Sequence, residues 1–177
     1  GYFAVDMIFG KQKEIVVGRG AVPNRYKIYT PELMAALTAY TAQGGNVMVT
    51  GANVASDVWD GISSGETEQK FASEVLGYKW RVGRASTDGR VYTVATPYKQ
   101  LAYGTEYVFS HTLNDRLYCV ESPDGVIASG EGGYTVFRYG ENNIPAGIAN
   151  DKGNYRTVVA GFPFETIECQ SSRNVMM

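Results

Sequence analysis

The chain has 177 residues, of which 44% are hydrophobic and 19% are charged, a composition typical of a globular domain rather than of a disordered segment. Its formal net charge of −2 at pH 7 offers no positive field to phosphate backbones, so nucleic acid is not an expected partner. No apolar run approaches the roughly 20 residues that span a bilayer, and no signal peptide is visible. We expect a single α/β domain over residues 1–177 that is a fragment of a longer protein, because the chain enters a strand at once and its last residues barely begin a helix.

A strand and a helix are expected near the start of the chain. Residues 2–9, YFAVDMIF, form a mostly apolar run that indicates a buried strand, and residues 11–29 are expected to form a long loop. Thr30 can cap the free amides of a helix over residues 31–43, which has proline at its first position and ends at a Gly-Gly pair. In that helix, Leu33, Leu37 and Tyr40 would form one apolar stripe.

A second strand is expected at residues 46–50, NVMVT, directly after the Gly-Gly pair. A helix followed by an apolar strand is the second half of a βαβ unit, so the strands at 2–9 and 46–50 would be parallel neighbours. Residues 51–66 then form a loop, and residues 67–76 form a second helix.

The second half of the chain has the pattern of β-structure. Residues 78–139 contain short alternating runs separated by turn signals, and Asp88-Gly89 predicts a hairpin. Residues 144–149 and 155–161 are expected to be paired strands, the last of which returns to the sheet. The predicted fold class is therefore α/β, with a parallel sheet as its core and a β-rich insertion at about 78–139.

The loop after residues 46–50 is the first-choice ligand site, because doubly wound sheets bind ligands at the carboxyl ends of their strands. Paired carboxylates there could serve a glycosidase or bind Ca²⁺ through oxygen, and an indole between them could stack on a sugar. The alternative is a solvated loop whose acidic groups lie near a helix N-terminus. The expected ligand-binding residues are Gly51, Asn53, Ser56, Asp57, Trp59 and Asp60.

The remaining reactive residues do not form a recognisable constellation. His111, the only histidine, could act as a general base, but we favour a strand-end residue bonded to a neighbour. Cys119 and Cys169 lie far apart and outside any CxxC pair, so buried free thiols are favoured over a disulfide or a zinc site. We expect no catalytic residue, with Asp57, Asp60 and His111 as the only candidates, and we expect neither a metal nor a cofactor.

Two segments resemble class I glutamine amidotransferase-like domains. LTAYTAQGGNVMVTGANVASD is similar to the helix, glycine turn and strand of those domains, and TVVAGFPFETI is similar to their last strand. This resemblance implies a flavodoxin-like parallel core. From about residue 30 onward, the order of GGNVMVTGANVASDVWD, YKWRVGRAS, FRYGENNIPAGIA and VVAGFPFETI is more closely similar to a domain of secreted xanthan lyase-like polysaccharide-processing proteins of gut anaerobes.

The departures from the amidotransferase pattern argue against that activity. The pattern has a cysteine at the strand-to-helix elbow, where this chain has TGAN at 50–53. It also has a histidine two residues before a glutamate near the last strand, where this chain has FPFE at 162–165, so Glu165 would be a relic. Nucleophilic catalysis needs a thiol or hydroxyl beside a base that can accept its proton. The resemblance therefore implies the fold without the reaction.

The leading hypothesis is a non-catalytic accessory domain of a secreted, periplasmic or cell-surface protein that processes polysaccharide. Its expected partners are neighbouring domains of the same polypeptide and, through the loop at 51–66, polysaccharide. One alternative is a glycoside hydrolase or polysaccharide lyase that uses Asp57, Asp60 or His111. Another is an oligomerisation or interaction module. The thirteen tyrosines suit half-buried strands, and sugar binding is the alternative explanation for them.

Overall fold

The structure is a computed structural model, and it describes residues 4–9, 14–17, 19–23, 26–60, 64–95 and 102–176. The strands are β1 (Ala4–Phe9), β2 (Glu14–Val17), β3 (Gly20–Pro23), β4 (Asn46–Gly51), β5 (Tyr78–Val82), β6 (Arg90–Thr93), β7 (Glu106–Val108), β8 (Gly125–Ala128), β9 (Gly133–Tyr139), β10 (Pro145–Asp151) and β11 (Arg156–Ala160). The helical segments are α1 (Pro31–Ala42), α2 (Ser56–Trp59), α3 (Glu66–Lys70), the π-helical η1 (Phe71–Leu76), the 3-10 helix η2 (Phe164–Thr166) and α4 (Gln170–Met176).

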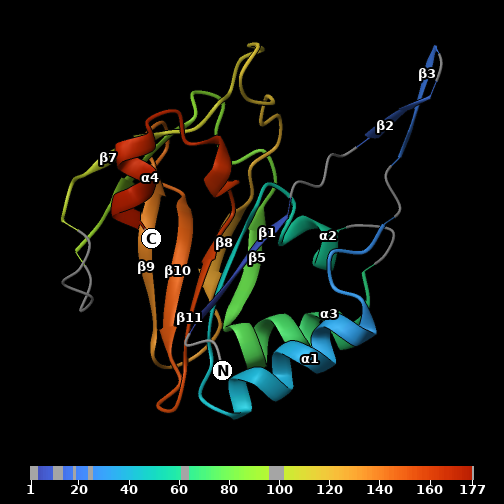
Figure 1. The fold of residues 1–177 in the computed structure, drawn as a ribbon, viewed down its shortest axis with the longest axis vertical. Helices are drawn as coiled ribbons and strands as arrows, with labels where there is room; N and C mark the ends of the chain where they lie inside the picture. Colours follow the sequence, from blue (N-terminus) through green and yellow to red (C-terminus); the bar gives the residue numbers. More distant parts are fainter. Residues whose placement is uncertain are drawn as a thin grey trace.

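Seven strands form one mixed sheet in the order β1-β4-β11-β10-β9-β6-β7. The pairings of β4 with β1 and with β11 are parallel. The pairings from β11 through β10, β9 and β6 to β7 are all antiparallel. Strands β5 and β8 form a small second sheet, and the hairpin β2–β3 reaches away from the rest of the chain (Figure 1). Among the described residues, no helix combines the length and hydropathy needed to cross a bilayer.

The predicted flavodoxin-like parallel core with a β-rich insertion is wrong. Strands β6, β7 and β9 come from the portion at 78–139, but they belong to the main sheet and make most of its pairings antiparallel. The hairpin expected at Asp88-Gly89 is also wrong, because β5 pairs with β8 and not with β6. The loop expected at 11–29 contains the hairpin β2–β3. Alternating patterns indicate which face of a strand is buried, but they do not say which strand lies next to it.

The local predictions at the parallel edge of the sheet are confirmed. Helix α1 begins at Pro31, and the Thr30 side chain accepts a hydrogen bond from the Leu33 amide at 3.3 Å. Strands β1 and β4 are parallel, β10 and β11 form an antiparallel pair, and β11 returns beside β4. The buried residues of α1 are Met34, Leu37 and Thr41, so the apolar stripe is rotated slightly from the predicted one.

The sheet has a hydrophobic core on each face, because β4 presents alternate residues to opposite sides. Val47 and Val49 face the first core, where α1 lies beside the continuous helical segment formed by α3 and η1 (Figure 1). Met48 packs against the second core, which is rich in aromatic rings. In that core, Phe109 and Phe162 stack with ring centroids 5.5 Å apart.

The small sheet is joined to the main sheet at a close contact between Asp124 and Gly161. The Asp124 amide donates to the Gly161 carbonyl at 2.7 Å, and the Tyr139 hydroxyl donates to the Asp124 carbonyl at 2.8 Å. A Cβ atom at position 161 would lie 1.9 Å from the Asp124 carbonyl oxygen, a distance that no real Cβ tolerates. Glycine is therefore required at position 161 for reasons of space.

We predict that Gly161→Ala lowers the free energy of unfolding by about 3 kcal/mol, because backbone must move to admit the methyl group. Urea unfolding measures the effect. Gly83→Ala is the matched control, since its Cβ would have no neighbour closer than 3.9 Å, and neither glycine has a positive φ. Equal stability of the two variants would contradict the close contact.

Candidate functional site

The loop after β4, which was the first-choice ligand site, is held in place by a single buried carboxylate. Asp124 Oδ2 accepts hydrogen bonds from the Ala55 amide and the Ser56 amide, both at 2.8 Å, and from the Ser56 hydroxyl at 3.1 Å. The Asp124 side chain is fully buried. Amides at such a turn could otherwise bind an anionic or polar ligand group. Here they are occupied by the chain's own carboxylate.

Burial raises the pKa of Asp124 to about 7. The three hydrogen bonds to Oδ2 oppose this shift, and the negative charge of nearby Asp57 adds to it. The other oxygen, Oδ1, is buried without a hydrogen-bond partner. The contact that fixes the loop therefore depends on the protonation of one carboxyl group near neutral pH.

Asp57 and Trp59 also hold the loop to the body of the protein. Asp57 is buried, and its Oδ2 accepts a hydrogen bond from the Ile28 amide at 2.9 Å, which anchors the segment before α1. Trp59 packs edge-to-face on Tyr78 with ring centroids 5.6 Å apart. The Tyr78 hydroxyl in turn donates to the Val54 carbonyl at 2.6 Å.

The other predicted ligand residues occupy different environments within the same turn. Gly51 is buried at the end of β4, and half-buried Asn53 accepts a hydrogen bond from the Ser56 hydroxyl at 3.3 Å. Asp60 is exposed directly after α2. The structure thus gathers the six residues around one turn, but Asp57 bonds to backbone while Asp60 faces solvent. A role for them in ligand binding stays a prediction.

His111 and the two cysteines lie apart from this loop in sequence and in their contacts. His111 is half-buried, with its Nδ1 3.4 Å from the Phe109 carbonyl oxygen. Both thiols are free, as predicted, but neither is buried: Cys119 is half-buried and Cys169 is exposed. Hydrogen bonds from Ser171 and the adjacent serine lower the pKa of Cys169 to about 7. Among the described residues, no group of three or more His, Cys, Asp or Glu is placed to hold a metal ion.

A pair of carboxylates on the opposite face of the sheet was not predicted as a site. The Tyr118 hydroxyl donates to Glu165 Oε1 at 2.5 Å, and burial together with this contact raises the pKa of Tyr118. Burial, and then the charge of Glu165, raise the pKa of Asp6 on β1. The sequence carried one signal for this pair, a lone carboxylate inside the apolar run AVDMIF.

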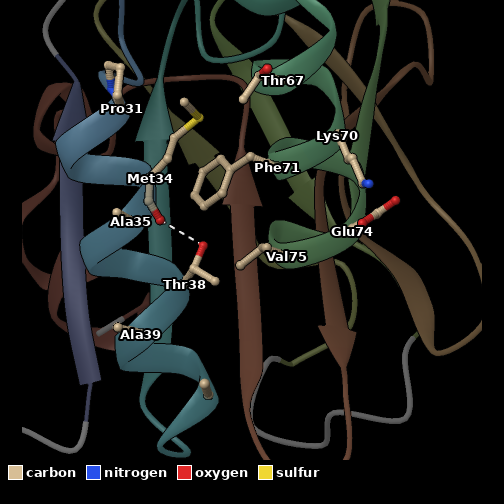
Figure 2. Close-up of a pocket in the computed structure, with 11 residues that line it drawn as sticks. Pro31, Met34, Ala35, Thr38, Ala39, Thr67, Lys70, Phe71, Glu74 and Val75 are labelled. Atoms are coloured by element: carbon tan, nitrogen blue, oxygen red, sulfur yellow. Dashed lines mark hydrogen bonds between the residues drawn. The ribbon is translucent and has the colours of Figure 1, made fainter.

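A groove runs between α1 and the helical segment α3–η1, with a volume of about 620 Å³ (Figure 2). Met34 and Phe71 approach each other across it, and Lys70 and Glu74 project along one rim. Most of its lining is apolar and small, so it suits an apolar segment better than a reaction centre. The lining residues are Pro31, Met34, Ala35, Thr38, Ala39, Ala42, Thr67, Lys70, Phe71, Glu74 and Val75.

No protein-family model matches the sequence, and a comparison with curated proteins found no match. Among solved structures, the chain is similar to Gan42B, a GH42 β-galactosidase, with a TM-score of 0.55, 15% identity, and coverage of 83% of this chain and 19% of that chain. It is also similar to a β-galactosidase from the Antarctic haloarchaeon Halorubrum lacusprofundi, with a TM-score of 0.50, 13% identity, and coverage of 81% and 19%. A third similar structure is the mmIFT52 N-terminal domain, with a TM-score of 0.53, 13% identity, and coverage of 84% and 68%.

These matches show a fold shared with part of each β-galactosidase, and this chain spans about a fifth of the length of those enzymes. They overturn the resemblance to class I glutamine amidotransferase-like and xanthan lyase-like domains, which was wrong. The motif GGNVMVT describes a glycine turn and a buried strand, and the helix before it completes a unit that many folds contain. Such motifs identify a local unit of structure, and they do not identify a family.

We predict that the free energy of unfolding falls as pH rises from about 4 to about 7, because folded Asp124 keeps its proton over that interval while the unfolded residue has lost it. Above about pH 7 both states are ionised and this contribution is constant. Each such proton gives a slope of at most about 1.4 kcal/mol per pH unit. Urea unfolding at a series of pH values measures it.

Asp124→Asn is expected to remove this part of the pH dependence while keeping an oxygen for the loop amides. Asp60→Asn changes an exposed carboxylate on the same loop, and it is expected to leave the slope unchanged. A wild-type slope that Asp124→Asn leaves intact would show that another group titrates.

Proposed function

We propose that this chain is a non-catalytic accessory domain of a larger carbohydrate-processing protein. The observation that carries the proposal is that the polar groups of the loop after β4 are bonded to other segments of the same chain. Asp124 occupies the loop amides, and Asp57 bonds to the Ile28 amide. A catalytic acid or base must be able to reach the proton that it transfers. Carboxylates that hold two backbone segments together serve the fold instead.

The solved structures support the carbohydrate-processing part of the proposal. Two of the similar proteins are β-galactosidases, and the matched region is about a fifth of each. A region of that size inside a longer enzyme is consistent with an accessory role. The similar mmIFT52 domain shows that the fold is not confined to β-galactosidases, so the match by itself assigns no substrate. We propose a secreted, periplasmic or cell-surface location, where polymeric carbohydrate is met.

We expect the isolated chain to cleave no polysaccharide. We also expect no difference in cleavage between the wild type and the variants Asp57→Asn, Asp60→Asn and His111→Ala. The measurement is release of reducing ends or unsaturated ends from a panel of neutral and acidic polysaccharides. Turnover that any one of these substitutions reduces at least about tenfold, about 1.4 kcal/mol in activation free energy, would establish the enzyme alternative instead.

Weak carbohydrate contact through the loop after β4 is tested by fluorescence. Trp59 is half-buried in this loop, and the other tryptophan, Trp80, lies on β5. Titration with oligosaccharides is expected to change the emission of the wild-type protein. Trp59→Phe should abolish the change and Trp80→Phe should preserve it. Tryptophan emission that does not change in the wild-type protein would show that carbohydrate does not bind at this loop.

A second candidate function is domain packing, and the groove between α1 and η1 favours it. Ala35, Thr38 and Ala39 are exposed on α1 and line this apolar groove. Since the matched region is about a fifth of each β-galactosidase, we propose that an apolar segment of a neighbouring domain of the same polypeptide fills it.

We predict that Ala39→Arg lowers the unfolding temperature of this domain within the intact protein by several degrees, because the charge would be buried in the contact. In the isolated chain it should have little effect. Ala36→Arg is the matched control, since Ala36 is exposed on the same helix but is not among the groove-lining residues. Scanning calorimetry of both forms measures the effect, and identical behaviour of the two variants in the intact protein would exclude this packing surface.

A further inference from the structure

Tyr92, Arg138 and Asn143 form a bonded cluster in the antiparallel half of the main sheet. Tyr92 on β6 lies directly opposite Arg138 on β9, and Asn143 lies in the turn between β9 and β10. The Tyr92 hydroxyl donates to Asn143 Oδ1 at 2.5 Å, and Arg138 Nη1 donates to the Asn143 carbonyl oxygen at 2.7 Å. Asn143 therefore holds the other two side chains in a fixed arrangement.

The cluster lies on the side of these strands that faces away from the second core. Val91 and Tyr139, the chain neighbours on the two strands, pack into that core. Since side chains alternate along a strand, Tyr92 and Arg138 project to the opposite side. There both are half-buried, while Asn143 is exposed. A ligand in solution can therefore reach all three side chains.

The guanidinium group of Arg138 forms no ion pair within the described part of the chain. The carboxylates of the adjacent segments are already bonded to other groups. Arg90 pairs with Asp88 and with Glu106, which lies opposite Tyr92 on β7, and Glu141 accepts a backbone amide of the segment between β5 and β6 at 2.7 Å. A half-buried cation without a counter-charge is costly, so the cluster favours a negative group.

The hydrogen-bonding capacity that the cluster retains consists mainly of donors. A guanidinium group has five N–H donors, and Arg138 uses one of them within the chain. The side-chain oxygen of Asn143 is bonded to Tyr92, which directs the Asn143 amide nitrogen and its two hydrogens elsewhere. A carboxylate accepts two parallel hydrogen bonds from a guanidinium group, and this geometry gives specificity as well as affinity.

We propose that this cluster binds a uronic acid residue of an acidic polysaccharide. Arg138 binds the sugar carboxylate, the Asn143 amide donates to a neighbouring sugar oxygen, and the Tyr92 ring covers the C–H face of the sugar. A neutral sugar leaves the guanidinium charge uncompensated, so acidic sugars are preferred. The choice of a sugar rests on the proposed carbohydrate-processing function, and the site is separate from the loop after β4.

Titration calorimetry with tetragalacturonate tests the site, and the methyl ester of the same oligosaccharide is the matched ligand, because it keeps the sugar rings and removes the charge. We expect the wild type to bind the acid at least about tenfold more tightly than the ester, since hydrogen bonds to charged groups are strong. The preference should shrink at high salt, because accessible charges are screened.

Arg138→Gln is expected to abolish the preference for the acid over the ester. Arg81→Gln removes an exposed arginine on β5 and should bind like the wild type. Asn143→Gly separates loss of the site from loss of the fold. Asn143 has a φ of 61°, which glycine adopts without strain, so this variant should keep the wild-type Tm and bind the acid several-fold more weakly.

Equal affinity for acid and ester, or wild-type affinity in Arg138→Gln, would overturn the proposal. Absence of tetragalacturonate binding at millimolar concentration would do the same. Acetate that displaces tetragalacturonate as effectively as galacturonate does would show a site for any carboxylate, and the sugar assignment would be wrong. None of these outcomes bears on the proposed accessory role, which is decided by turnover of polysaccharide.

Discussion

The rest of the structure depends on the buried carboxyl group of Asp124 and the backbone around it. Its side chain accepts hydrogen bonds from two amides and a hydroxyl of the turn after β4, some 69 residues earlier in the chain. Its own amide donates to the Gly161 carbonyl after β11, and its carbonyl accepts a hydrogen bond from the Tyr139 hydroxyl at the end of β9. One residue thereby joins the small sheet, the parallel edge of the main sheet and the antiparallel half. Since bonded polar groups in a low-dielectric interior interact strongly, these contacts fix the relative position of all three parts.

The same contact decides what the loop after β4 can do. A turn after a parallel strand normally leaves amides free, and in many α/β proteins a ligand uses them. In this protein they are already satisfied, and Asp57 is likewise occupied by the Ile28 amide. Of the two acidic residues that suggested a reaction centre, Asp57 holds the segment before α1 to the loop, and Asp60 faces solvent. This is the physical basis for proposing an accessory role.

Surface that lacks a partner lies away from this loop. The helical face presents an apolar groove between α1 and η1, where apolar surface lacks a partner. On the opposite face, one side-chain oxygen each of Asp6 and Thr50 is buried without a hydrogen-bond partner. The apolar groove suits contact between domains. The groove is compatible with the proposed role as one domain of a larger protein, since such a domain needs packing surfaces more than chemistry of its own.

The sequence by itself determined the elements whose signals are local. Thr30 and Pro31 set the start of α1, the Gly-Gly pair set its end, and the apolar runs set the parallel strands β1 and β4, because caps, turns and periodicity act over a few residues. Only the tertiary structure decided that β6, β7 and β9 extend the main sheet, that β5 pairs with β8, and that Asp124 meets the turn after β4. An alternating run of apolar and polar residues predicts which face of a strand is buried, and an isolated Asp predicts a charged group. The packing of the whole chain decides which distant segment covers that face or bonds to that carboxylate, and residues nearby in sequence do not.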